Sequence, residues 1–213
     1  MRSSFALLFL LGCTSEEKVT SYNSNPEATI VSHSSPEEFL EGYEITFQAT
    51  VSDSNHGTDK LSVKWSTDQR ELCAAGNPES DGLTVCTARL QEGESQVIVQ
   101  VTDPDGASGI ATVDFTVLPS IAPEVSIISP TSDERYYTDG QILFSAMITD
   151  TEDASSDLTY SWESSIDGVL PSTTIPNSDG LVEEYFMLSE GEHAITLSAE
   201  DLSGKITTQN TSI

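Results

Sequence analysis

The segment LSEGEHAITLSAEDLSG, residues Leu188–Gly204, repeats the segment LQEGESQVIVQVTDPDG, residues Leu90–Gly106. Both begin with Leu and a Glu-Gly-Glu turn, continue with apolar residues at every second position, and end in Asp-x-x-Gly. Self-similarity at a fixed spacing indicates tandem repeats, and alternation of apolar and polar residues is typical of a half-buried β-strand. The stretch therefore predicts two copies of one β-domain.

Further matches extend the repeat in both directions from this segment. They are the apolar faces Ile45, Phe47, Ala49, Val51 and Ile142, Phe144, Ala146, Ile148, and the pairs Leu61, Trp65 and Leu158, Trp162. Asp-Gly and Asn-x-Gly turns separate these runs. The pattern predicts an all-β chain of two tandem antiparallel β-sandwiches with about seven strands each. The last run, from about Lys205 to Ile213, is polar, and we expect a frayed edge strand there.

Four segments divide the chain. Residues 1–12 are predicted to be a signal peptide, residues 13–25 a flexible polar tether, residues 26–118 the first domain and residues 119–213 the second domain. The joint between the domains, Leu118 to Pro123, carries two prolines and predicts an extended, semi-rigid connection.

The chain is strongly acidic. Its 213 residues include 35 Asp and Glu but only 8 Lys and Arg, for a formal net charge of −27. A nucleic-acid binder needs positive charge to neutralise phosphates, so no nucleic-acid partner is expected. The acidity is open to two interpretations, solubility through self-repulsion or binding of divalent cations.

The N-terminus has the pattern of an exported protein. A basic residue, Arg2, precedes the apolar run Phe5–Leu11, which is too short to span a bilayer. Leu10-Leu11-Gly12-Cys13 resembles the bacterial lipobox. The resemblance implies cleavage before Cys13, acylation of Cys13, and a lipid-anchored bacterial protein of the cell envelope, at the outer membrane or cell surface. An ordinary signal peptide is the alternative.

Cys73 and Cys86 are the other two cysteines, and the second repeat has no counterpart to them. An exported chain meets an oxidising compartment, which favours a disulfide between them. Metal ligation is the weaker alternative, because no His or further Cys lies at a suitable spacing.

Several repeated residues resemble those of Ig-like sandwiches in bacterial surface proteins, closest to the PKD and cadherin-like families. They are Asp53, Trp65, Gly93, Asp103 and Gly106, and in the second repeat Asp150, Trp162, Gly191, Asp201 and Gly204. The resemblance covers residues 26–213 and implies an Ig-like fold with each Trp in the core. A sugar-stacking role for the Trp residues is the alternative. The aromatic-Asp-x-Gly-Asp-Gly signature that often follows the PKD tryptophan is missing.

Acidic loops are expected to meet at one pole of each sandwich. In such a fold, the loop after the second strand and the loop before the last strand leave at the same end. The candidate Ca²⁺ ligands are Asp150, Glu152, Asp153 and Asp201 in the second domain, and Asp53, Asp103 and Asp105 in the first. The acidic pole of the second domain is expected to face the exit of the first domain, where Glu92, Glu94 and Glu41 are expected to lie. Alternatively, these Asp residues only cap turns.

Catalytic motifs do not occur in the sequence, which contains no Gly-x-Ser-x-Gly, His-Glu-x-x-His or phosphate-binding loop. We therefore expect a non-enzymatic protein that presents tandem domains for adhesion, for interaction with a surface protein or glycan, or as a spacer. A calcium-dependent carbohydrate-binding or calcium-stabilised module is the alternative. No cofactor other than Ca²⁺ is implied.

Overall fold

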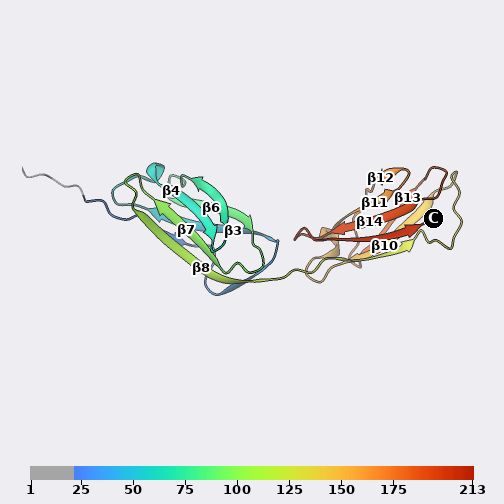
Figure 1. Ribbon diagram of the computed structural model, residues 1–213, viewed down its shortest axis with the longest axis horizontal. Helices are drawn as coiled ribbons and strands as arrows, with labels where there is room; N and C mark the ends of the chain where they lie inside the picture. Colours follow the sequence, from blue (N-terminus) through green and yellow to red (C-terminus); the bar gives the residue numbers. More distant parts are fainter. Residues whose placement is uncertain (1–21) are drawn as a thin grey trace, which may run out of the picture.

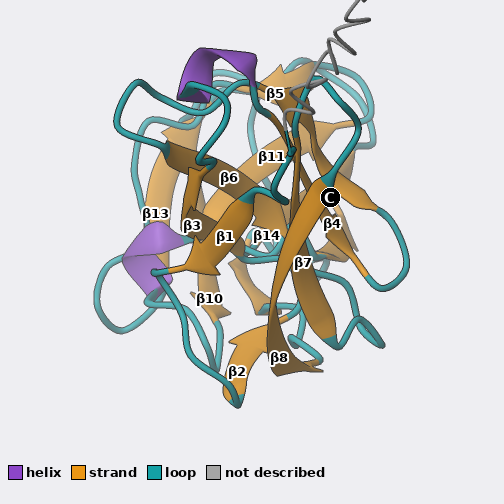
Figure 2. Cartoon of the chain, turned by 90° about the vertical axis from the view of Figure 1, so that its left-hand side faces the viewer, coloured by secondary structure: helices purple, strands orange, loops and turns teal. Residues whose placement is uncertain are grey.

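The computed structural model describes residues 22–213, so the predicted signal peptide, Cys13 and most of the tether lie outside the described residues. Almost every element is a strand, and the chain forms two tandem Ig-like β-sandwiches that lie end to end (Figure 1). Viewed along the long axis, the strands of one sandwich lie in front of those of the other (Figure 2). Within residues 22–213, no helix is long and apolar enough to cross a membrane.

The first sandwich contains eight strands in two sheets. One sheet has the order β1 (Glu27–Ile30), β3 (Glu44–Ser52), β6 (Leu83–Arg89). The other has the order β2 (Glu37–Leu40), β8 (Ser108–Leu118), β7 (Gln96–Thr102), β4 (Ser62–Thr67), β5 (Glu71–Gly76). Neighbouring strands are antiparallel except β2 and β8, which are parallel. A short 3-10 turn, η1 (Thr58–Lys60), precedes β4.

The second sandwich repeats this plan with seven strands. One sheet has the order β13 (Leu181–Phe186), β10 (Ile142–Thr149), β9 (Glu124–Ser129). The other has the order β12 (Gly168–Leu170), β11 (Thr159–Ser164), β14 (Ala194–Glu200), β15 (Ile206–Ser212), and the turn η2 (Ser155–Asp157) precedes β11. In the described part of the second repeat, no strand corresponds to β2.

The predicted frayed end is wrong. Strand β15 is an edge strand, as expected, but it pairs with β14 over all seven of its residues. Backbone hydrogen bonds form the ladder whatever the side chains are, and the polar side chains of an edge strand remain in water at little cost.

Each sandwich has its own core, built from the alternating residues of both sheets. Trp65 and Trp162 lie at the centre and are almost completely buried, which confirms their predicted place in the core. Trp162 packs edge-on against Phe144, with ring centroids 5.1 Å apart. Such T-shaped pairs are favoured because the positive ring edge meets the negative ring face.

The Asp-Gly turns have a steric reason for glycine in both repeats. Gly82 and Gly180 have φ of +87° and +85°. A Cβ at either would lie within 2.5 Å of a carbonyl oxygen on β3 or β10, the strand that pairs with the one beginning just after the glycine, namely that of Val51 or Ile148. Only glycine combines a positive φ with so close an approach. Glycine occurs at this position in both repeats because both sandwiches make the same close backbone contact.

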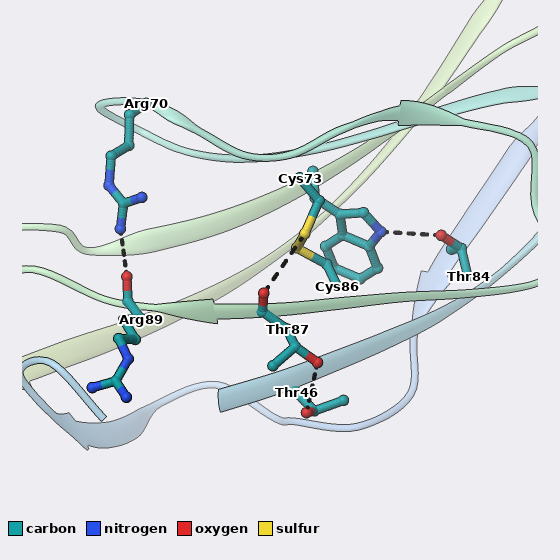
Figure 3. The surroundings of a disulfide bond; sticks show 8 residues. Thr46, Arg70, Cys73, Thr84, Cys86, Thr87 and Arg89 are labelled. Carbon is teal, nitrogen blue, oxygen red and sulfur yellow. Dashed lines mark hydrogen bonds between the residues drawn. A yellow bond between two sulfur atoms is a disulfide. The ribbon is translucent and has the colours of Figure 1, made fainter. Parts of the chain in front are cut away.

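The predicted disulfide is confirmed. Cys73 on β5 and Cys86 on β6 are joined, and the bond bridges the two sheets of the first sandwich (Figure 3). It lies beside the indole of Trp65, whose N–H donates to Thr84 Oγ1 at 3.1 Å. Closing a loop of this length contributes about 3 kcal/mol in the chain-entropy model.

Candidate functional site

The two Asp residues that close β3 and β7 lie together at the N-terminal pole of the first sandwich. Val51 and Val101 point into the core, and side chains alternate along a strand, so Asp53 and Asp103 continue the inward face one step beyond the apolar core. Neither carboxylate has any exposed side-chain surface. The alternation that builds the core thus places two carboxylates beneath the surface of this pole.

Turns anchor one oxygen of each carboxylate. Asp53 Oδ1 accepts the N–H groups of Asn55 and His56, and Asp103 Oδ1 accepts the N–H of Ala107 at 2.9 Å. Asn23 Nδ2 donates to Asp103 Oδ2 at 2.7 Å. The turn-capping interpretation is therefore correct for Oδ1 of each carboxylate, while Asp103 Oδ2 accepts the Asn23 amide and Asp53 Oδ2 has no hydrogen-bond partner among residues 22–213.

His56 joins these two carboxylates. Its Nδ1 lies 3.5 Å from Asp53 Oδ1 and 3.9 Å from Asp103 Oδ2, and its Nε2 lies 3.5 Å from Asp105 Oδ2. The structure thus brings together the predicted residues Asp53 and Asp103 and places Asp105, which is exposed, at the rim. Sequence reasoning missed His56. Its position three residues after Asp53, in the Asn-His-Gly turn, is the signal that could have identified it.

Local contacts decide the charge of Asp103. Burial acts to raise the pKa of its carboxyl, but hydrogen bonds from Asn23 and the backbone, together with the nearby His56 ring, hold that pKa below its usual range. Asp103 is therefore ionised at neutral pH. The pole holds a buried negative charge that needs a positive partner.

The corresponding pole of the second sandwich has the same plan. Asp150 and Asp201 close β10 and β14, and each fixes one oxygen on neighbouring turn groups. The second oxygen of each is buried without a hydrogen-bond partner among residues 22–213. Asp153 lies next to them and accepts the N–H of Leu202 at 3.0 Å, whereas the Glu152 carboxylate accepts the hydroxyl of Thr151. Asp150, Asp153 and Asp201 thus lie together as predicted. The Glu152 carboxylate, the fourth predicted ligand, contacts Thr151 instead.

This second pole faces the first sandwich. Burial raises the pKa of Tyr43, the residue just before β3, and Asp153, Asp150 and Asp201 raise it further. The Tyr43 hydroxyl is therefore protonated and lies against the acidic group of the next domain. One cluster thus contains residues from both sandwiches.

Polar contacts join the two sandwiches around this cluster. Lys205 Nζ lies 2.9 Å from Glu41 Oε2 of the first sandwich, and it also donates to the carbonyl of the linker residue Ser120 at 2.6 Å. Arg89 Nη1 donates to the Leu202 carbonyl at 2.8 Å. Glu41 was expected at this junction and is there. Surface ion pairs contribute little singly, about 0–1 kcal/mol each, so the junction depends on several contacts acting together.

Glu94 lies at the exit of the first sandwich, as expected, but within residues 22–213 its carboxylate bonds only to groups of that sandwich. Its carboxylate is buried and pairs with Arg70 at 2.7 Å, and it also accepts the hydroxyl of Thr67. A buried carboxylate requires a charged or donating partner, and Arg70 provides it from the adjacent hairpin. Glu94 is a structural residue of the first sandwich.

His193 occupies a similar structural place in the second sandwich. Its Nδ1 lies 2.7 Å from Ser164 Oγ and 3.7 Å from Asp167, while its Nε2 meets the Ser189 carbonyl at 2.9 Å. Ser164 and His193 are both buried. A nucleophile must be reachable by substrate, with its base between it and the orienting acid. Here, Ser and Asp share one ring nitrogen, so the trio holds a turn and does not form a catalytic triad.

No family model and no curated protein matches the chain. Similar solved structures include the fibronectin(III)-like modules of Clostridium thermocellum CbhA, 18% identical with a TM-score of 0.42, over 87% of this chain and 92% of that chain. The titin domains Z1Z2, solved in complex with telethonin, are 15% identical with a TM-score of 0.32, over 90% of this chain and 96% of that one. The titin M1 domain is 15% identical with a TM-score of 0.29, over 42% of this chain and 94% of that domain.

Proposed function

We propose that this chain is a lipid-anchored bacterial cell-envelope protein that holds two Ig-like sandwiches away from the membrane, as a spacer and as an adhesion module. Cys13 would carry the lipid, and the partner would be a surface protein or glycan that meets the edge strands or polar loops. Fold alone does not determine function. The observation that carries the proposal is the polar junction, because a spacer must resist bending between its domains.

The junction is built for close approach of the two sandwiches. Gly42 has φ of +78°, and a Cβ on it would lie 2.6 Å from the Ser203 carbonyl oxygen. Close to this contact, Lys205 reaches Glu41 of the first sandwich and Arg89 reaches the Leu202 carbonyl of the second. A cavity of about 570 Å³ lies beside them, lined by residues of both sandwiches. These contacts favour a preferred orientation between the domains.

We expect Gly42→Ala to loosen this junction. The new Cβ meets Ser203 and also strains a positive φ, so the two sandwiches separate while each core remains folded. Small-angle X-ray scattering should show a broader distribution of interdomain distances for this variant. Gly76→Ala is the matched control, because Gly76 has no atom within 4 Å of an added Cβ. Identical scattering from both variants would contradict a junction held by this contact.

A calcium-stabilised junction is the second candidate function. The second oxygens of Asp150 and Asp201 are buried and lack hydrogen-bond partners within the described chain, at the pole that faces the first sandwich. Hard carboxylate oxygens are the ligands that Ca²⁺ takes. A bound cation would neutralise this pole and stiffen the joint between the domains.

Calcium should therefore raise the melting temperature of the second sandwich. At a free concentration of 100 times Kd, one site adds about 2.7 kcal/mol, and Asp201→Asn should abolish the increase. Asp157→Asn, which removes an exposed carboxylate from the same loop region, should keep it. The same melting temperature in calcium and in chelator would remove this candidate.

A further inference from the structure

The buried charge at the pole of the first sandwich lacks a permanent counter-charge. The Asp53 and Asp103 side chains have no exposed surface. Within residues 22–213, their only ion-pair partner is the imidazole of His56, which is charged only when protonated. Burying an ionised carboxylate without a paired charge is strongly unfavourable. Such an arrangement favours binding of a cation from solution.

Three atoms at this pole that could each bind a metal ion are buried and have no hydrogen-bond partner among residues 22–213. These atoms are Asp53 Oδ2, His56 Nδ1 and Asn23 Oδ1. Buried polar atoms are normally satisfied, and each exception calls for an explanation such as an ion. Asp53 and His56 reach this pole from one turn, and Asn23 from the segment before β1. Two separate segments of the chain thus bring potential metal-ligand atoms to the same pole.

The spacing of these groups suits a small divalent ion. One ligand atom each from Asp53, His56 and Asp103 lies within 4.8 Å of the other two. Around a tetrahedral zinc ion with bonds of about 2.0–2.1 Å, ligand atoms lie about 3.3 Å apart. His56 Nδ1 lies 3.5 Å from Asp53 Oδ1, which also accepts turn N–H groups, and 3.9 Å from Asp103 Oδ2, which also accepts the Asn23 amide. Small side-chain rotations would close the difference.

The other nitrogen of His56 has the environment expected for a metal-bound imidazole. A ligating histidine usually directs its second ring N–H to a carboxylate, which fixes the tautomer. Asp105 Oδ2 lies 3.5 Å from His56 Nε2. A proton on Nε2, facing Asp105, leaves the lone pair of Nδ1 directed toward Asp53 and Asp103.

We propose that Asp53, His56 and Asp103 bind one divalent transition-metal ion of the zinc type, with Asp105 orienting His56. The imidazole decides the class of metal, because zinc, nickel and copper accept nitrogen ligands, whereas calcium takes oxygen. Three protein ligands leave a fourth position of a zinc ion open to water or to an oxygen such as that of Asn23. The site is independent of the calcium candidate at the junction.

The second sandwich provides an internal comparison. Asp153 stands three residues after Asp150, as His56 stands three residues after Asp53. Its pole therefore presents only oxygen donors from the corresponding turns, and one oxygen of Asp153 is already bonded to the backbone of Leu202. His56→Asp would convert the first pole to the same all-oxygen type. The His56→Asp variant therefore tests whether the imidazole makes the site prefer zinc over calcium.

Isothermal titration with zinc chloride and, in parallel, calcium chloride tests the proposal. The protein is the mature chain with Cys13→Ser, so that no free thiol contributes. We expect one zinc ion per chain, with affinity reduced at least about 100-fold in His56→Gln and in Asp53→Asn, because loss of even an outer partner of a zinc ligand costs 10–100-fold. His56→Asp should lose zinc binding and retain or gain calcium binding. Asp59→Asn, which removes an exposed carboxylate of the same loop, should bind zinc as the parent chain does.

Melting temperatures in chelator establish that each variant is folded before titration, and His56→Asp replaces His56→Gln if the latter does not fold. Zinc binding that survives both His56 substitutions would overturn the proposal. So would a parent chain that binds no zinc, since His56 would then serve only as an ion-pair partner of Asp53 and Asp103.

Discussion

Replacing Trp162 with Ala is expected to destabilise the second sandwich by about 3–5 kcal/mol, the usual cost of truncating a buried aromatic to Ala. The Trp162 side chain is fully buried and packs against Phe144. Truncation loses the burial of the indole and leaves a cavity that the two sheets cannot close. Domains are stable by only about 5–15 kcal/mol. Urea denaturation followed by circular dichroism should show an earlier transition for this sandwich.

Phe variants of the two tryptophans provide the matched control. The Trp65 N–H donates to Thr84 Oγ1, whereas the Trp162 N–H has no partner among residues 22–213. Trp65→Phe therefore loses a hydrogen bond, and Trp162→Phe removes an unsatisfied group. We expect Trp65→Phe to cost about 1 kcal/mol more than Trp162→Phe. Equal losses of stability in the two Phe variants would show that the Trp65 hydrogen bond does not contribute to stability. An unchanged urea transition for Trp162→Ala would contradict the placement of Trp162 in the core.

Replacing Cys13 with Ala is expected to release the chain from membranes completely. If Cys13 is acylated with two or three chains, the membrane anchor gains about 0.8 kcal/mol for each buried CH₂ group, which makes attachment effectively permanent. No other residue is proposed to carry a lipid. Cell fractionation with detection of the protein should show the parent chain in the membrane pellet and the variant in the soluble fraction.

Cys73→Ala with Cys86→Ala is the control for the Cys13 prediction, because it removes the disulfide and leaves Cys13 in place. This double variant should remain in the membrane pellet. A Cys13→Ala protein that still pellets with membranes after a carbonate wash would contradict the lipid anchor.

Repetition made much of the fold predictable from sequence. Alternating apolar residues, glycine turns and the two tryptophans recur at nearly constant spacing, and each recurrence corresponds to matched strands such as β7 and β14. The disulfide was also predictable, because only two cysteines remain once Cys13 is assigned to the lipobox. These features depend on local period and composition, which a sequence displays directly.

The replacement for the disulfide in the second sandwich was not predictable. Phe47 pairs with Cys86 and Trp65 with Cys73, whereas Phe144 pairs with Glu184 and Trp162 with Leu170. Glu184 is buried, and its Oε1 accepts the N–H groups of Thr173 and Thr174. Its negative charge and burial raise the pKa of Tyr160 to about 12, burial being the larger cause. A buried glutamate that ties down a loop replaces a covalent bond between sheets.

The sequence by itself determined two β-sandwiches, their cores, the disulfide and the general location of two acidic poles, because side chains alternate along a strand with a period of two. Only the tertiary structure decided which groups meet beyond the strand ends. It placed His56 between Asp53 and Asp103, turned Glu94 inward to Arg70, and set Lys205 against Glu41. Loop residues have no such period, so their directions depend on contacts between segments far apart in the chain.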